Sequence, residues 1–192
     1  NGGHGSTINA AIDAARGSYF KAVDSDDWVE REGIEKLVSA LDGSDCDVAF
    51  NPFYIVDADS GEKRLSDDCF EPGNPIGQVL PIDEIAGRMH LAMHATTFRT
   101  GLLKSSQYRL DEHCFYVDTE YVVYYFGVCE TAMLLDWPVY DYLLGTAEQS
   151  MSFGNMIKRR KQHEKVCLAC ARFYEEHPDL VGKRERIIRG HI

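Results

Sequence analysis

The sequence predicts an α/β fold, and two observations carry that prediction. Short β-prone apolar segments at 19–23, 47–56 and 94–98 alternate with segments whose apolar residues recur at helical spacing. Glycines follow two of the helical segments, at Gly17 and Gly43, where a helix commonly ends. With 192 residues, 44% of them hydrophobic, the chain is long enough to bury a substantial core.

The first predicted helix begins near Ser6 or Thr7, after a glycine-rich lead, and ends at Gly17. Hydroxyl side chains are favoured at helix N-termini because they accept bonds from free backbone N–H groups. No acidic residue lies near this helix start, so its free donors offer a seat for an anion. The strand at 19–23 follows directly.

Hydrophobic period and turn residues predict the later elements. They are a helix over 31–41, a strand over 47–56, a turn at 57–61, an irregular loop over 66–81, a short helix over 83–91, a strand over 94–98, a brief helix from 100, a helix running to 126, and a long amphipathic helix over 153–177. We expect residues 1–152 to form the main domain and 153–192 a helical extension.

Three carboxylates crowd the positions after the first strand: Asp24, Asp26 and Asp27. Like charges this close repel, and a hard divalent cation such as Mg²⁺ or Mn²⁺ compensates them while keeping positions open for substrate phosphates. We therefore predict that Asp24 and Asp26 are metal ligands, with Asp26 favoured as the direct one. The alternative is a solvated acidic turn.

Asp118 lies at the first turn of the helix that runs to residue 126. Backbone donors and the helix dipole stabilise a carboxylate there, so we expect Asp118 to be ionised and fixed in direction. Glu120 is a second, weaker candidate for the same role. The alternative is that Asp118 only caps the helix.

Charge and cysteine content exclude some classes of function. The net charge of −11 disfavours a nucleic-acid partner, which requires a basic face. Scattered cysteines, with a single C-x-x-C pair, favour free thiols and a reducing cytosol over a zinc site. No apolar stretch approaches the roughly 20 residues of a membrane span. A basic group at 158–161 is most simply a solvated face, with an anionic membrane surface or a diphosphate as alternatives.

Several motifs together resemble the centre of the inverting family 2 glycosyltransferases, which have the GT-A fold. The matching residues are Asn1, Gly3, Asn9, Ala15-Arg16-Gly17-Ser18-Tyr19 and Asp24-Ser25-Asp26-Asp27-Trp28. The resemblance implies a mixed sheet flanked by helices. It also implies metal-dependent, inverting transfer from a nucleotide-diphosphate sugar to a glycan or a lipid-linked acceptor, as in bacterial cell-surface polysaccharide synthesis.

The resemblance also implies roles for individual residues. Asn1, Gly3, Asn9 and Asp24 would contact the donor, and Asp24 and Asp26 would hold the metal. Asp118 would be the catalytic base, although Val117 stands where the family has a Glu, so only Asp118 is carried over. A cytoplasmic location follows, with peripheral membrane contact left open.

Relatives begin with an apolar strand and nucleotide-binding motifs that this sequence lacks. We therefore expect the chain to be a fragment without roughly the first third to half of the fold, judged from typical domain sizes. Residues 19–23 would then form an open sheet edge, covered by the N-terminal part or by a second copy of the chain. Nucleotide binding by this chain alone would be weak.

Two other classes remain open at this stage. A non-catalytic carbohydrate-binding or scaffold domain is one. A phosphotransferase with an Asp nucleophile is the other, although that class continues with Gly-Thr or Thr/Val where this chain has Asp27-Trp28. His90, His94 and His113 are further candidates near an acceptor cleft, without an assigned role.

Overall fold

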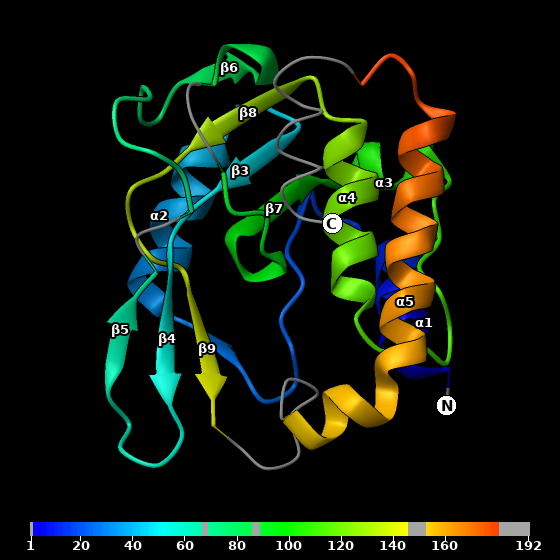
Figure 1. Cartoon of the computed structure of the whole chain (residues 1–192). Coiled ribbons are helices and arrows are strands. Elements are labelled where there is room, and N and C mark those ends of the chain that lie inside the picture. Colours follow the sequence, from blue (N-terminus) through cyan, green and yellow to red (C-terminus); the bar gives the residue numbers. More distant parts are fainter. Residues whose placement is uncertain (1, 67–68, 86–88, 146–152, 181–192) are drawn as a thin grey trace.

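The computed structural model describes residues 2–66, 69–85, 89–145 and 153–180, and in these ranges the chain has an α/β fold with two mixed sheets (Figure 1). The helices are α1 (Gly3–Ala14), α2 (Arg31–Leu41), α3 (Thr100–Ser106), α4 (Val117–Gly127) and α5 (Phe153–Glu176). The strands are β1 (Tyr19–Phe20), β2 (Trp28–Val29), β3 (Val48–Phe50), β4 (Phe53–Asp57), β5 (Lys63–Leu65), β6 (Val79–Pro81), β7 (Thr96–Arg99), β8 (Thr131–Leu134) and β9 (Tyr140–Leu144).

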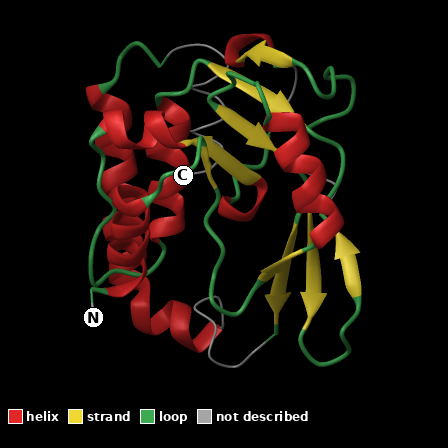
Figure 2. Cartoon of the chain, turned by 180° about the vertical axis from the view of Figure 1, so that it is seen from behind, coloured by secondary structure: helices red, strands yellow, loops and turns green. Residues whose placement is uncertain are grey.

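The larger sheet has five strands in the order β1-β7-β3-β8-β6, and helices cover both of its faces (Figure 2). Val48 and Phe50 on β3 join the main core cluster with residues of α1, α4 and α5. Ala49, which points to the other face, packs with Leu37 and Leu41 of α2. This alternation along β3 is why all three of its residues are fully buried.

A smaller sheet with the order β2-β9-β4-β5 extends from the large one, at the lower left of Figure 1. β3 pairs with β8 and β4 pairs with β9, both in parallel, so the two chain segments pass together from one sheet into the other. The turn after β4 was predicted correctly, since β4 and β5 form an antiparallel hairpin around it.

The prediction of one continuous strand over 47–56 was wrong. Asn51 and Pro52 interrupt it, because proline has no N–H for a ladder bond and its φ is fixed. Asn51 is fully buried, its N–H donates to Ala95 O at 3.0 Å, and its side-chain amide donates to Pro52 O at 2.9 Å. These two hydrogen bonds hold the bend at which the chain leaves the large sheet.

Two helix predictions also differ from the structure. α1 begins at Gly3 rather than at Ser6 or Thr7, where His113 N donates to Gly2 O at 2.6 Å and fixes the chain just before the helix. In place of a helix over 83–91 there is a single 3₁₀ turn, Ile82–Glu84, and Met89 forms an isolated bridge with Phe70. Residues 86–88 lie outside the described ranges.

The long C-terminal helix is confirmed as α5, which packs against α4 (Figure 1). Val166, Cys170 and Phe173 lie in the main core cluster, whereas Ile157, expected on the same face, is exposed. All six cysteines are free thiols and all but Cys167 are buried. The helices were also examined for membrane spans by length and hydropathy: within the described ranges, no helix is both long enough and apolar enough to cross a bilayer.

β1 lies at the edge of the large sheet and, in the part of the chain that the structure describes, pairs only with β7. An open edge here was expected, although the strand ends at Phe20 rather than at residue 23.

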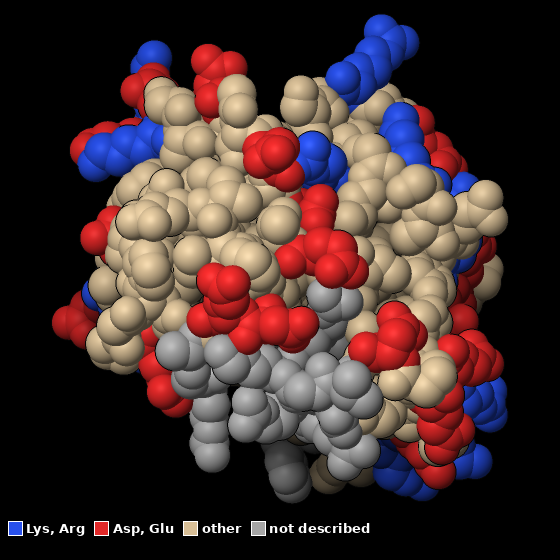
Figure 3. Space-filling model, turned by 90° about the horizontal axis from the view of Figure 1, so that it is seen from above, with Lys and Arg blue, Asp and Glu red and all other residues tan. Residues whose placement is uncertain are grey.

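The surface reflects the acidic composition: Figure 3 shows one face across which Asp and Glu side chains form several groups.

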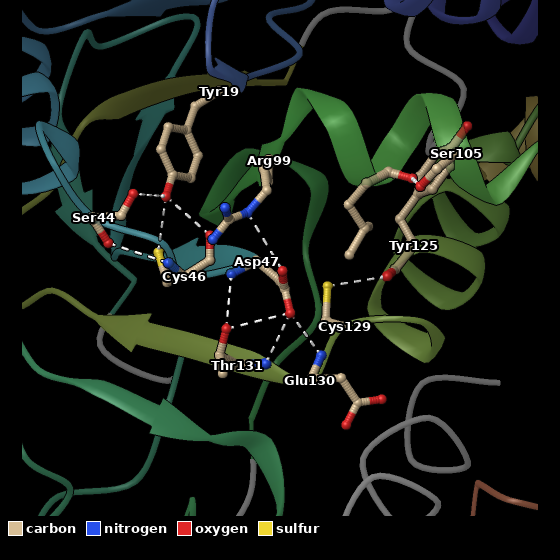
Figure 4. A network of polar contacts seen from close by, with 11 residues as sticks. Tyr19, Ser44, Cys46, Asp47, Arg99, Ser105, Tyr125, Cys129, Glu130 and Thr131 are labelled. Atoms are coloured by element: carbon tan, nitrogen blue, oxygen red, sulfur yellow. Dashed lines mark hydrogen bonds and ion pairs between the residues drawn. The ribbon is translucent and has the colours of Figure 1, made fainter.

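A polar network ties the strands of the large sheet together at the end where β3 and β8 begin (Figure 4). Asp47 Oδ2 accepts bonds from the N–H groups of Glu130 and Thr131, at 2.9 and 3.1 Å. Asp47 Oδ1 pairs with Arg99 Nε at 3.5 Å, and Tyr19 Oη donates to Cys46 O at 2.9 Å. One carboxylate therefore links β3, β7 and β8.

Replacing this carboxylate should destabilise the protein without touching the functional site. Asp47→Ala removes an acceptor of the Glu130 and Thr131 N–H groups and the partner of Arg99, and we expect a loss of about 1–2 kcal/mol in the free energy of unfolding. Urea denaturation followed by circular dichroism measures it. Glu35→Ala, which removes only an exposed ion pair with Arg31, is the control and should change the midpoint little. Equal effects of the two variants would show that the network is not a structural link.

Candidate active site

A cavity of about 1010 Å³ lies beside the acidic residues of the predicted metal site. It is lined by residues from α1, the segment after β1, the segment before β7, the start of α4, and β9. These are His4, Thr7, Ile8, Ala11, Phe20, Lys21, Ala22, Val23, Asp24, Ser25, Asp26, His90, Leu91, Ala92, Met93, His94, Phe115, Tyr116, Asp118, Thr119 and Tyr142. Asp24, Asp26 and Asp118 thus border one cavity.

Residues 24–27 form an acidic turn, closed by the N–H of Asp27 donating to Asp24 O at 3.2 Å. Tyr140 Oη of β9 donates to Asp27 Oδ2 at 2.5 Å and accepts from the N–H of Asp24 at 3.1 Å. The N–H of Leu143 donates to Asp27 Oδ1 at 2.8 Å. Both ends of the acidic turn are therefore fixed to β9, and Asp27 supports the turn.

Burial raises the pKa of Asp27 to about 6, against the opposing effect of the bonds from Tyr140 and Leu143. Asp24, at the other end of the turn, lies against α1, with His4 Nε2 at 3.2 Å from its Oδ1. This bond raises the pKa of His4, so the protonated form of His4 is stabilised beside the carboxylate. Positive charge is favoured at this point of the cavity.

Three side chains in the described ranges come close enough to share a cation: ligand atoms of Asp24, Asp27 and His94 all lie within 4.8 Å of one another. Two carboxylates and an imidazole are a donor set that suits a divalent cation. Asp26 is exposed and lines the same cavity, but it is not in this group. Its role as a direct metal ligand stays a prediction, and His94 is an addition to the predicted set.

Lys21 is a charged cavity residue whose role sequence reasoning missed. Its Nζ donates to His94 O at 2.7 Å and to Thr96 O at 3.2 Å, and burial lowers its pKa to about 7. A lysine inside the apolar run at 19–23 was the signal that could have identified it, because a charged side chain in such a strand requires buried polar partners.

Asp118 is the second residue of α4 and faces the cavity. Burial raises its pKa, while the backbone N–H groups of the helix start and the nearby His4 act in the opposite direction. The Asp118 side chain is exposed where it opens on the cavity, yet desolvation by the surrounding protein raises its pKa, which makes the carboxylate a better proton acceptor. The N-cap residue, Tyr116, makes no side-chain capping bond, whereas the backbone N–H groups of Asp118 and Thr119 bond the Asp118 carboxylate and fix its direction.

Glu120, the second candidate, is placed differently. It is 1% exposed, is not part of the cavity lining, and its Oε2 accepts the N–H of Asp111 at 2.8 Å. Burial raises its pKa to about 7. The structure therefore gives Glu120 a contact with the preceding loop, and Asp118 alone of the two faces the cavity.

The predicted donor-contacting residues are only partly placed. Asn1 lies outside the described residues. Gly3 has φ +81° and starts α1, close to the backbone of His113. The Asn9 amide donates to Leu110 O and accepts from Leu110 N, both at 3.0 Å, so it fastens α1 to the loop before α4. Donor contact by Gly3 and Asn9 stays a prediction.

The fold and this cavity define the class: an α/β domain of the GT-A type, with an acidic turn and a helix-borne carboxylate on one cavity. A family model described as glycosyl transferase family 2 matches residues 1–106, and the chain belongs to that family. No curated protein matches the chain.

Solved structures of S. aureus TarS share the fold. TarS 1–349 in complex with UDP-GlcNAc aligns with a TM-score of 0.62 and 20% identity, over 79% of this chain and 42% of that one. A second TarS structure gives 0.58 and 18%, over 74% of this chain and 25% of that one. The chain thus spans less than half of the length of these structures. The mixed sheet and helices of the GT-A fold, expected from the sequence, are confirmed.

Removing the Tyr140 hydroxyl should loosen the acidic turn. Tyr140→Phe deletes a bond at each end of the turn, and we expect weaker Mn²⁺ binding together with a loss of about 1–3 kcal/mol in the free energy of unfolding. Mn²⁺ titration followed by electron paramagnetic resonance measures the affinity. Tyr54→Phe, on the neighbouring strand β4, is the matched control and should keep the affinity. Unchanged Mn²⁺ affinity in Tyr140→Phe would contradict the role of this hydroxyl.

Proposed function

We propose that the chain is part of an inverting glycosyltransferase that moves a sugar from a nucleotide-diphosphate sugar to an acceptor hydroxyl. One observation carries the proposal: the acidic turn after β1 and Asp118 of α4 border the same cavity. Membership in glycosyl transferase family 2 supports the reaction class. The UDP-GlcNAc complex of TarS supports a uridine diphosphate sugar as the first donor to test.

The donor side of the cavity is formed by the acidic turn and the start of α1. Asp24 and Asp26 would hold a divalent cation, which when bound neutralises charge on the diphosphate leaving group. His4 holds Asp24 in place at 3.2 Å and brings a proton-dependent positive charge to the same region. The N–H groups at the start of α1, which carries no acid in its first turn, favour an anionic group.

Asp118 provides the acceptor side. In the proposed reaction its carboxylate takes the proton of the acceptor hydroxyl while that oxygen forms a bond to the anomeric carbon and the bond to the diphosphate breaks. Attack opposite the leaving group inverts the anomeric centre in one step. Burial, which raises the pKa of Asp118, increases its proton affinity for this task.

The proposed acceptor is a glycan or a lipid-linked glycan of a bacterial surface polysaccharide, and the proposed location is the cytoplasm. Peripheral membrane contact would use the basic group at 158–161 of α5. Arg159, a member of this basic group, contacts the protein itself: its guanidinium lies 3.5 Å from the centre of the Phe115 ring, which lines the cavity. Association of two copies along the edge of β1 is part of the same proposal.

Substitution of Asp118 tests the proposal. We expect Asp118→Asn to lower sugar transfer from UDP-GlcNAc by at least about a hundredfold, since a general base contributes roughly 10²–10⁴-fold. UDP affinity should change little, because only the transition state uses the base. The full-length gene product is assayed for sugar transfer, and its affinity for UDP is measured by calorimetric titration.

Asp136→Asn, an exposed carboxylate outside the cavity, is the control. A parallel loss of UDP affinity and transfer in Asp118→Asn would assign Asp118 a structural role. Full transfer activity in Asp118→Asn would refute the proposal for this residue.

A further inference from the structure

We infer that His94 is a nitrogen ligand of the divalent cation held beside Asp24, and that it makes the site favour Mn²⁺ over Mg²⁺. The inference rests on the proposed function, since it concerns the cation beside Asp24; the ligand atoms grouped with Asp24 are those of Asp27 and His94 rather than Asp26. It adds a ligand from a distant part of the chain, 70 positions after Asp24, and a selectivity that carboxylates alone would not give.

The His94 ring lies close enough to Asp24 and Asp27 to share an ion with them. A ring nitrogen of His94 and carboxylate oxygens of Asp24 and Asp27 lie within 4.8 Å of one another. Metal–ligand bonds of about 2.0–2.2 Å put two ligands on one ion at most about 4.4 Å apart. A small contraction of the group around an ion is therefore sufficient. Each oxygen of Asp27 accepts one hydrogen bond, from Tyr140 or Leu143, and Asp24 Oδ1 lies 3.2 Å from His4 Nε2, so both carboxylates keep lone pairs for an ion.

Neighbouring side chains fix the position of the His94 ring. The ring stacks on Tyr142 with centroids 4.2 Å apart and an interplanar angle of 18°, and it meets Phe53 edge-on at 5.0 Å. Lys21 Nζ holds the backbone carbonyl of His94 at 2.7 Å. A ring clamped on its faces and at its backbone loses little freedom when it binds an ion.

One ring nitrogen of His94 lacks a hydrogen-bond partner. His94 Nδ1 is buried and has no hydrogen-bond partner in the described part of the chain. A buried polar atom without a partner is destabilising, and such atoms in native proteins commonly mark a bound ion, water or catalytic role.

Charge favours a cation at the same point. Asp24 and Asp27 approach each other at the two ends of the acidic turn, and the nearby Lys21 directs its Nζ to backbone carbonyls instead of to these carboxylates. Mg²⁺ prefers oxygen ligands and near-ideal octahedral geometry, whereas imidazole suits first-row transition ions. One nitrogen among the ligands therefore shifts the preference toward Mn²⁺.

Pulsed electron paramagnetic resonance of the full-length protein loaded with Mn²⁺ tests the inference directly. Echo-envelope modulation should show ¹⁴N coupling from a coordinated imidazole, and labelling all histidines with ¹⁵N should replace it with the ¹⁵N pattern. This measurement uses the unmodified protein, so it does not depend on a variant that folds. The coupling should disappear in His94→Gln and persist in His90→Gln, a matched histidine of the same cavity.

Affinity gives a second readout. We expect His94→Gln to weaken Mn²⁺ binding roughly tenfold or more, and Mg²⁺ binding much less, as for loss of a side chain that supports a metal. Mn²⁺ binding without nitrogen coupling, or coupling that persists in His94→Gln, would overturn the inference. If Asp24→Asn abolishes Mn²⁺ binding in that case, the metal site of the proposed function stands and only His94 is removed from it. Failure of Asp118→Asn to affect transfer would bear on the proposed reaction alone.

Discussion

The hydroxyl group of Tyr140 is the contact on which the candidate site depends. It donates to Asp27 and accepts from the N–H of Asp24, so one atom of β9 fixes both ends of the acidic turn. Tyr140 is fully buried, and burial together with the bond to Asp27 raises its pKa, which keeps the hydroxyl protonated and able to donate. Three neighbouring carboxylates can thus be held in one geometry despite their mutual repulsion.

The division into two sheets makes this contact available. β3 and β8 leave the large sheet together and continue as β4 and β9, which turns β9 toward the segment after β1. Successive side chains of β9 point to opposite faces of the small sheet, so one face serves the site and the other does not. Tyr140 and Tyr142 face the acidic turn and His94, whereas Asp141 between them pairs with Lys63 at 2.7 Å on the opposite face. The small sheet therefore acts as a support for the site.

Burial determines the chemistry of the cavity more than contact between charges does. Desolvation is the largest cause of the raised pKa of Asp118 and of the lowered pKa values of Lys21 and His94. Desolvation favours a neutral imidazole and a carboxylate with increased proton affinity at the same cavity. Perturbed groups that gather in one cavity are typical of catalytic sites, and of these three the sequence had assigned a role only to Asp118.

The sequence by itself determined the α/β class, the acidic turn at 24–27 and the position of Asp118 at a helix start, because each follows from local patterns of charge and hydrophobic period. Only the tertiary structure decided which residues meet. The bonds of the Tyr140 hydroxyl and the approach of His94 to Asp24 join segments 70 or more positions apart. Such contacts follow from how strands pair across the whole fold, which local residue preferences do not specify.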